Sequence, residues 1–137
     1  MVVSFGAILG GYDRRDGKMI LSFDTDGGVY PHERFATNGS GYSQARDYID
    51  DRFQYDLSLE EAVGITIGAI RQAGKHVTSV SHPLDPPPTV KIINKDGIIN
   101  ISEESIVQWI METEEEEVAH LFAKQIPQDN PVAKQQN

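Results

Sequence analysis

The segment from Asn38 to Ala73 constrains the fold of this chain most strongly, because it encodes two consecutive helices after a glycine-rich turn. The turn is Gly39-Ser40-Gly41. Apolar residues then recur at intervals of three and four, which places them on one helical face. These residues are Tyr42, Ala45, Tyr48, Ile49 and Phe53, and they predict a first helix.

A longer helix is expected to begin at Ser58, where Ser58-Leu59-Glu60-Glu61 forms a capping box. In this motif the serine hydroxyl accepts a hydrogen bond from a free backbone N–H of the first turn, and the glutamate carboxylate accepts one from the backbone N–H of the serine. Gly64 and Gly68 lie inside this helix, where each costs about 1 kcal/mol relative to alanine. Their presence predicts a close approach by another element, within one subunit or between subunits. The expected apolar stripe is Leu59, Ala62, Val63, Thr66, Ala69, Ile70 and Ala73.

Three strands are expected before the first helix. Val2 to Leu9 alternates between two mostly apolar faces, which is typical of an interior strand, so we expect a partner to cover its open edge. Turn residues around Gly17 lead to a second strand from Met19 to Asp24, with Met19, Leu21 and Phe23 buried. A third short strand is expected over Glu33 to Thr37, with Pro31 in a loop or at a sheet edge.

The C-terminal part of the chain predicts irregular structure, a hairpin and one more helix. Prolines exclude regular structure between Val77 and Thr89. Strands are expected from Val90 to Ile93 and from Ile98 to Ile101. Ser102 can cap a last helix in which Ile106, Trp109 and Ile110 face inward. The resulting class is α+β with antiparallel sheets, two central helices and a C-terminal helix, in a single domain over residues 1–125 with a disordered tail over 126–137.

Composition excludes several kinds of partner and site. The 12 basic and 21 acidic residues give a net charge of −9, which disfavours nucleic acid and anionic membranes. The longest apolar run is far below the ~20 residues of a membrane span, so we expect a cytoplasmic protein. There is no cysteine for a disulfide, a nucleophile or a zinc site, and no cofactor is expected. Four histidines show no metal-ligand spacing: His32, His76, His82 and His120.

Four motifs in series resemble the second half of proteasome β-type subunits. They are Gly10-Gly11-Tyr12-Asp13, the segment Phe23 to Gly28, Gly39-Ser40-Gly41 and the acid-rich segment Asp56 to Ala62, and the resemblance spans Ser4 to Ile101. It implies part of the four-layer αββα sandwich of N-terminal-nucleophile hydrolases. It also implies partners, either other proteasome-like subunits or a complementing N-terminal half, in rings that enclose a proteolytic chamber.

The same resemblance implies a catalytic set that this sequence does not contain. The family uses an N-terminal threonine with a nearby aspartate and lysine, all in its first half. Here no threonine precedes Thr25. Ser40 matches the serine that the family adds in its Gly-Ser-Gly turn, so residues 39–41 resemble a remnant active-site turn. Val77, Val80 and Ser81-His82 replace a family segment rich in aspartate, serine and glycine, and we therefore expect a non-catalytic chain.

Other interpretations of the polar candidates remain open. Ser40 can support a catalytic amine or act as an ordinary turn or helix-cap residue. The glycine turn lacks the lysine of a phosphate-binding loop. Asp24 and Asp26 suit local turn bonds, with acid–base or magnesium chemistry as the alternative. Glu114 to Glu117 suits a solvated helix face, or an acidic docking strip for a basic partner.

Three functions follow from the sequence. The first is a non-catalytic β-like subunit or half-subunit of a self-compartmentalising proteolytic core. The second is the C-terminal piece of an active threonine endopeptidase subunit. The third is a proteasome-derived binding module without a protease role.

Overall fold

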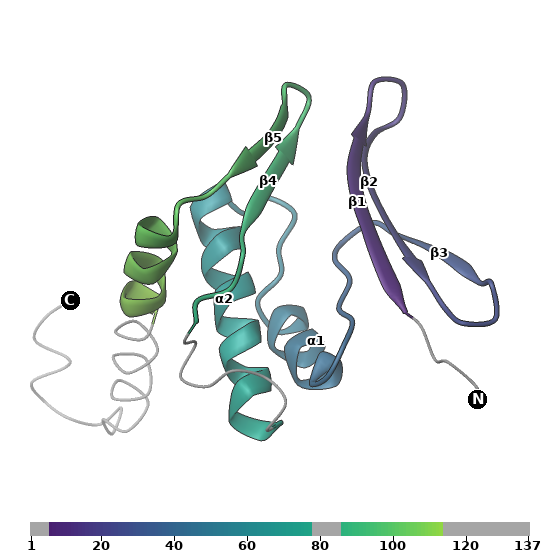
Figure 1. Cartoon of the computed structure of the whole chain (residues 1–137). Helices are drawn as coiled ribbons and strands as arrows, with labels where there is room; N and C mark the ends of the chain where they lie inside the picture. The colour runs from purple at the N-terminus through teal and green to yellow at the C-terminus, as the bar shows by residue number, and fades with distance from the viewer. Residues whose placement is uncertain (1–5, 78–85, 114–137) are drawn as a thin grey trace, which may run out of the picture.

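The computed structural model describes residues 6–77 and 86–113, which form two antiparallel sheets and three helices (Figure 1). The α+β class expected from the sequence is confirmed. The N-terminal sheet has the order β1-β2-β3 and the later hairpin pairs β4 with β5. The expected strand residues before Gly6 and the expected tail over 126–137 lie outside the described residues.

The first two strands are β1 (Ala7–Asp13) and β2 (Gly17–Phe23), paired so that Ala7 lies opposite Phe23 and Asp13 opposite Gly17. The strand therefore continues through Gly10 and Gly11 instead of ending at Leu9. Gly17 has φ 80°, a left-handed conformation that glycine adopts without strain, so its predicted role in the turn is confirmed.

The third strand is β3 (Val29–His32), so the prediction of a strand over Glu33 to Thr37 is wrong. The physical reason is the tight turn after β2, which returns the chain immediately. Asp24 Oδ1 accepts the backbone N–H groups of Gly28 at 2.7 Å and Asp26 at 3.1 Å. Pro31 lies in β3 opposite Leu21, at an edge of the described sheet, where a missing amide is tolerated.

The helical pair is α1 (Tyr42–Asp50) and α2 (Leu59–His76). The capping box of α2 is confirmed: Glu61 N–H donates to Ser58 Oγ at 3.1 Å, and Ser58 N–H donates to Glu61 Oε2 at 2.7 Å. The first helix is shorter than predicted, because Phe53 lies in the loop beyond it. Tyr42 is 53% exposed and does not contribute to the core.

The core lies around α2, and Ile67 is its most buried side chain at 0% exposed. The predicted stripe is only partly correct, because Leu59 and Thr66 are exposed while Ile67 and Arg71 are buried. Arg71 donates from Nη2 to Ile110 O at 2.9 Å and to Thr113 Oγ1 at 2.7 Å, which ties α2 to the helix over 103–113. The buried apolar residues described are Val63, Ile67, Ala69, Ala73 and Ile106.

The close approach predicted from the two helix glycines occurs at Gly68. A Cβ built there would lie 2.6 Å from Tyr48 Cζ, so the Tyr48 ring of α1 occupies the space that a side chain at this position would need. A Cβ at Gly64 would meet Thr113 Cγ2 at 3.6 Å, which is ordinary contact. The structure thus assigns Gly68 to packing within this chain.

The C-terminal elements follow the prediction closely. The hairpin is β4 (Lys91–Asn94) and β5 (Gly97–Asn100), one residue away from the expected ranges. Ser102 Oγ accepts Ser105 N–H at 3.3 Å at the start of the helix over 103–113. Ile106 is buried in this helix, and Trp109 and Ile110 pack against the α2 core.

The strands carry much of the exposed apolar surface, whereas the buried apolar residues of the described ranges all lie on helices. Met19 is 37% exposed, and Leu21 and Phe23 are half-buried, so the predicted burial of the second strand is not reached within the described residues. The residues of β2 from Ile20 to Phe23 are half-buried, whereas most of β1 and β3 is exposed. The exposed strand residues are Ile8, Leu9, Tyr12, Met19, Val29, Tyr30, Ile93, Ile98 and Ile99.

Candidate functional site

The Gly39-Ser40-Gly41 segment forms a tight turn that opens α1. Tyr42 N–H donates to Gly39 O at 3.1 Å, which closes a four-residue turn with Ser40 and Gly41 at its centre. Gly41 has φ 78° and ψ 12°, the conformation of the third residue in a type II turn. Glycine is required there because other residues rarely adopt positive φ.

Ser40 is exposed in this turn and is not the cap of α1. The cap residue is Gly41, and no side chain caps this helix. The helix-cap interpretation of Ser40 is therefore wrong, whereas its interpretation as a turn residue is confirmed. A hydroxyl on the outside of the turn is available to a neighbouring group.

The turn packs against the C-terminal end of α2. A Cβ built on Gly41 would lie 2.8 Å from Ala73 Cβ and 3.4 Å from Val77 Cγ2. The structure thus brings together two positions that the family resemblance assigns to one site, the glycine turn and residue 77. Sequence reasoning missed the contribution of Ala73, whose small side chain allows the approach.

The chemistry available at this junction is limited. Val77 is half-buried and presents a branched hydrocarbon beside the turn, which neither accepts a hydrogen bond nor holds a charge. Val80 and Ser81-His82 lie outside the described residues. In the described part of the junction, Ser40 offers an exposed hydroxyl, the Thr37 hydroxyl donates to Tyr42 O at 3.0 Å, and the neighbour at position 77 is apolar.

The aspartates that follow β2 serve the turn. Asp24 Oδ2 accepts the Tyr30 hydroxyl at 2.9 Å, and its other oxygen accepts the two backbone amides described above. The hydrogen bonds from the Gly28 amide and the Tyr30 hydroxyl lower the pKa of Asp24. The hydrogen bond between Tyr30 and Asp24 also raises the pKa of Tyr30. The local-bond interpretation of Asp24 is confirmed, with Asp26 contributing its backbone amide.

The histidines that can be placed form isolated contacts. Ser22 Oγ lies 2.8 Å from His32 Nε2 across β2 and β3, and Gln72 Nε2 lies 3.1 Å from His76 Nε2 one turn away on α2. Among residues 6–77 and 86–113, no group of three or more metal-ligating side chains comes together. His82 and His120 lie outside these ranges.

None of the helices in residues 6–77 and 86–113 combines the length and the hydropathy that crossing a bilayer requires.

The antiparallel sheets, the helical pair and the glycine turn that opens α1 are consistent with a proteasome-type fold, and comparison with known proteins gives the family. Residues 2–83 match the model of the proteasome subunit family. This chain belongs to the proteasome subunit family. It is 30% identical to a proteasome subunit beta of Methanocaldococcus vulcanius over 103 residues, and 32% identical to one of Methanothermobacter thermautotrophicus over 103 residues.

Coverage differs sharply between this chain and those relatives. The first match covers 75% of this chain but 44% of the relative, and the second covers 75% and 47%. A proteasome subunit beta 1 of Caldivirga maquilingensis is 35% identical over 69 residues, which are 50% of this chain and 34% of that protein. The chain therefore spans less than half the length of the curated relatives that it matches.

Proposed function

We propose that this chain is a non-catalytic half-subunit of a proteasome-type, self-compartmentalising proteolytic core. Residues 1–125 act as the second half of one four-layer αββα domain, and residues 126–137 form a tail. Another polypeptide segment supplies the complementary half, and the complete assembly works in the cytoplasm. In this proposal, Gly39, Ser40 and Gly41 are a remnant active-site turn.

The observation that carries the non-catalytic role is the position of Val77 beside the turn at Gly41. The family resemblance implies an acidic side chain at position 77, where a carboxylate beside the turn would tune a catalytic amine. Valine fills this place with hydrocarbon, 3.4 Å from the Cβ position of Gly41. Ser40 retains a hydroxyl, but a hydroxyl alone does not tune a neighbouring amine as a carboxylate does.

The exposed apolar residues of the strands support the need for a complementary half. Val29 and Tyr30 are each 52% exposed on β3, and Ile98 is 62% exposed on β5. Large exposed apolar patches on a soluble domain mark interaction surfaces. Covering one large apolar side chain contributes about 1.5–3 kcal/mol, so burying several of them favours a stable complex.

The decisive experiment is reconstitution with a defined complement. The chain is co-expressed with the part of the Methanocaldococcus vulcanius relative that the match leaves uncovered, and the product is analysed by native mass spectrometry and a fluorogenic peptide assay. We expect a stoichiometric complex without peptide hydrolysis. A threonine-directed covalent probe is included in the same samples.

Two outcomes oppose the proposal. Hydrolysis with probe labelling of a threonine in the complement would favour the alternative, the C-terminal piece of an active endopeptidase. A chain that stays monomeric with that complement would favour a separate binding module.

A matched pair of variants tests whether the strand surface forms the contact. Ile99→Asp places a charge on the exposed apolar surface of β5 and is expected to abolish the complex. Lys95→Asp changes the exposed turn of the same hairpin and is expected to preserve it.

A further inference from the structure

The pair Asn38-Gly39 lies where the glycine turn begins, and it is the only Asn-Gly pair in the sequence. Both residues are exposed. A Cβ built on Gly39 would meet no atom within 4 Å, so the space around this residue is open. Because glycine has no side chain, its backbone nitrogen can closely approach the side-chain carbonyl carbon of the asparagine before it.

The hydrogen bonds of the turn surround this pair without holding its reactive groups. Thr37 Oγ1 donates to Tyr42 O at 3.0 Å, and Tyr42 N–H donates to Gly39 O at 3.1 Å. Within the part of the chain that the structure describes, the side-chain amide of Asn38 and the N–H of Gly39 make no hydrogen bond. Both groups are therefore available to react with each other.

The other asparagines that the structure describes, Asn94 and Asn100, are held in place. Asn94 Oδ1 accepts the backbone N–H of Asp96 at 2.8 Å, a local bond that fixes its side chain. Asn100 is followed by the β-branched Ile101, whose N–H donates to a backbone carbonyl at 3.1 Å. The arrangement at Asn38 thus differs from both, although all three asparagines are exposed.

We propose that Asn38 is a site of spontaneous deamidation. The Gly39 nitrogen attacks Asn38 Cγ and forms a new C–N bond, the bond from Cγ to Nδ2 breaks, and ammonia leaves with the proton of the Gly39 amide. Water then opens the cyclic imide at either carbonyl. The product is aspartate or isoaspartate, and each adds one negative charge. No enzyme is needed, because the two reacting groups are adjacent in one chain and asparagine is chemically labile.

The new carboxylate forms beside the start of β1. Asn38 Oδ1 lies 3.0 Å and Asn38 Cγ 3.5 Å from the Cβ position of Gly6, so this glycine leaves room for the side chain. Aspartate keeps the length of the backbone. Isoaspartate adds one methylene to the main chain directly before Gly39, which has φ 93° in the turn. Two modified forms are therefore expected, one with an added charge beside an intact turn and one with a lengthened turn.

The reaction involves only residues of this chain. It therefore does not depend on whether a complementary half or a catalytic site exists.

Incubation of the folded full chain in mildly alkaline buffer made with heavy-oxygen water tests the proposal. Digestion and mass spectrometry are expected to show that the peptide with Asn38 changes from amide to acid, gains one heavy oxygen and elutes in two forms. The rate is expected to rise with pH, because base removes the proton of the Gly39 nitrogen. Peptides with Asn94 and Asn100 are expected to remain amides over the same time.

A matched pair of variants assigns the reaction to Asn38. Asn38→Gln lengthens the side chain and disfavours ring closure, so loss of the acidic product is expected. Asn94→Gln makes the same change in the β4–β5 turn and is expected to leave the rate unchanged. Circular dichroism of each variant confirms folding, and wild-type chain in urea gives the rate without the fold.

The proposal is overturned if the folded wild-type chain keeps Asn38 as an amide, whether or not the chain in urea converts it. It is also overturned if Asn94 or Asn100 converts as fast as Asn38, or if Asn38→Gln forms the acidic product at the wild-type rate.

Discussion

Gly68 shows how one missing side chain positions a helix in this protein. Tyr48 from α1 occupies the space where a Cβ would stand, so the two helices approach at this residue. Gly64 lies one turn earlier, and a Cβ there would make only an ordinary contact with Thr113. Two glycines four residues apart thus have different roles, which makes them a natural matched pair.

We predict opposite effects for alanine at these two positions. Gly68→Ala is expected to destabilise the protein by about 1–3 kcal/mol, because Tyr48 must move. Gly64→Ala is expected to be neutral or to stabilise by up to about 1 kcal/mol through helix propensity. Urea denaturation followed by circular dichroism measures both, and equal effects at the two positions would contradict the assigned packing.

The Asp24 carboxylate is expected to make the stability of its turn sensitive to acid. The pKa of Asp24 in the folded chain lies below the ordinary value of 3.8. The stability that the ionised carboxylate contributes is therefore fully present above pH 3.8 and is lost as the pH falls through the folded-state pKa. Asp24→Asn is expected to remove this acid-sensitive contribution. Chemical shifts of the Gly28 and Asp26 amides, followed between pH 7 and pH 2, measure the titration.

Asp26→Asn is the control for this titration, because Asp26 contributes its backbone amide to the turn and not its carboxylate. We expect its amide shifts to follow the wild-type curve. Loss of the transition in this variant would show that Asp24 is not the titrating group.

At the scale of elements, one edge of β5 pairs with no strand of residues 6–77 and 86–113, and its other edge pairs with β4 in a defined hydrogen-bonding register. Ile101 N–H donates to Val90 O, so this pair is hydrogen-bonded, and alternation along the register makes Ile92 and Ile99 the next such pair. The main-chain groups of Ile99 therefore point toward β4. Those of Ile98 point outward, toward whatever completes the sheet.

Proline substitutions at Ile98 and Ile99 distinguish the binding of a partner strand from the folding of the hairpin itself. Ile98→Pro removes an outward amide and is expected to weaken binding of the complementary half, while the β4–β5 pairing persists. Ile99→Pro removes an amide of the ladder and is expected to disrupt the hairpin itself. Native mass spectrometry reports the complex and amide shifts report the hairpin. Unchanged binding by a folded Ile98→Pro chain would exclude strand addition at this edge.

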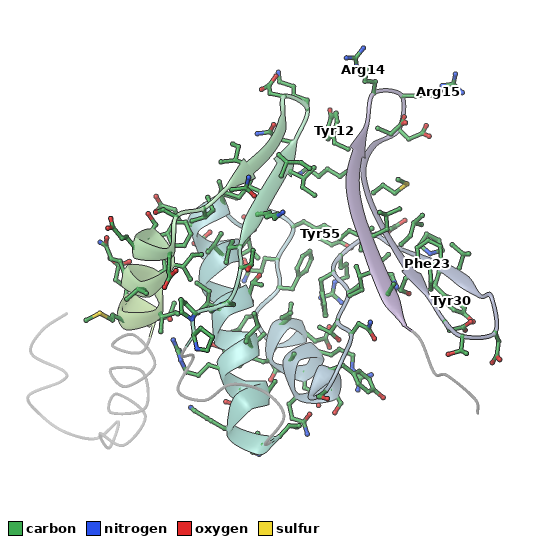
Figure 2. The ribbon with its side chains drawn as sticks, viewed as in Figure 1. Tyr12, Arg14, Arg15, Phe23, Tyr30 and Tyr55 are labelled. Atoms are coloured by element: carbon green, nitrogen blue, oxygen red, sulfur yellow. The ribbon has the colours of Figure 1, made fainter. Side chains whose placement is uncertain are left out.

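On the scale of the whole molecule, the buried apolar residues that the structure describes lie on the helices, and most of the exposed large apolar residues lie on the strands. Figure 2 shows Phe23 and Tyr30 among the side chains of the N-terminal sheet, apart from the core around α2. Stability is therefore expected to be uneven, with local opening easiest in the strands. A partner that covers the sheets is therefore expected to reduce local opening mainly in the strands.

Hydrogen exchange with mass spectrometry tests this uneven stability. In the isolated chain we expect the slowest exchange in α2 and much faster exchange in β1 to β5. Adding the complementary half is expected to slow the strands far more than α2. Strands as protected as α2 in the isolated chain would show that the sheets need no partner.

Much of the element order was predictable because it depends on local chemistry. The capping box at Ser58, the turn glycine at position 17 and the hairpin around Asp96 follow from residues close in the sequence. The third strand was misplaced because the turn held by Asp24 uses side-chain and backbone bonds that periodicity does not reveal. Ile67 and Arg71 were missed because α2 is buried on more than one face.

The sequence by itself determined the helices, the turns and the family, since caps, glycines and motif spacing are local properties. Only the tertiary structure decided that Gly41 lies beside Ala73 and Val77 and that Gly68 lies beside Tyr48. These contacts join residues far apart along the chain, and their geometry depends on how whole elements pack. The physical reason is that local pattern sets what each segment becomes, whereas packing sets which segments share a site.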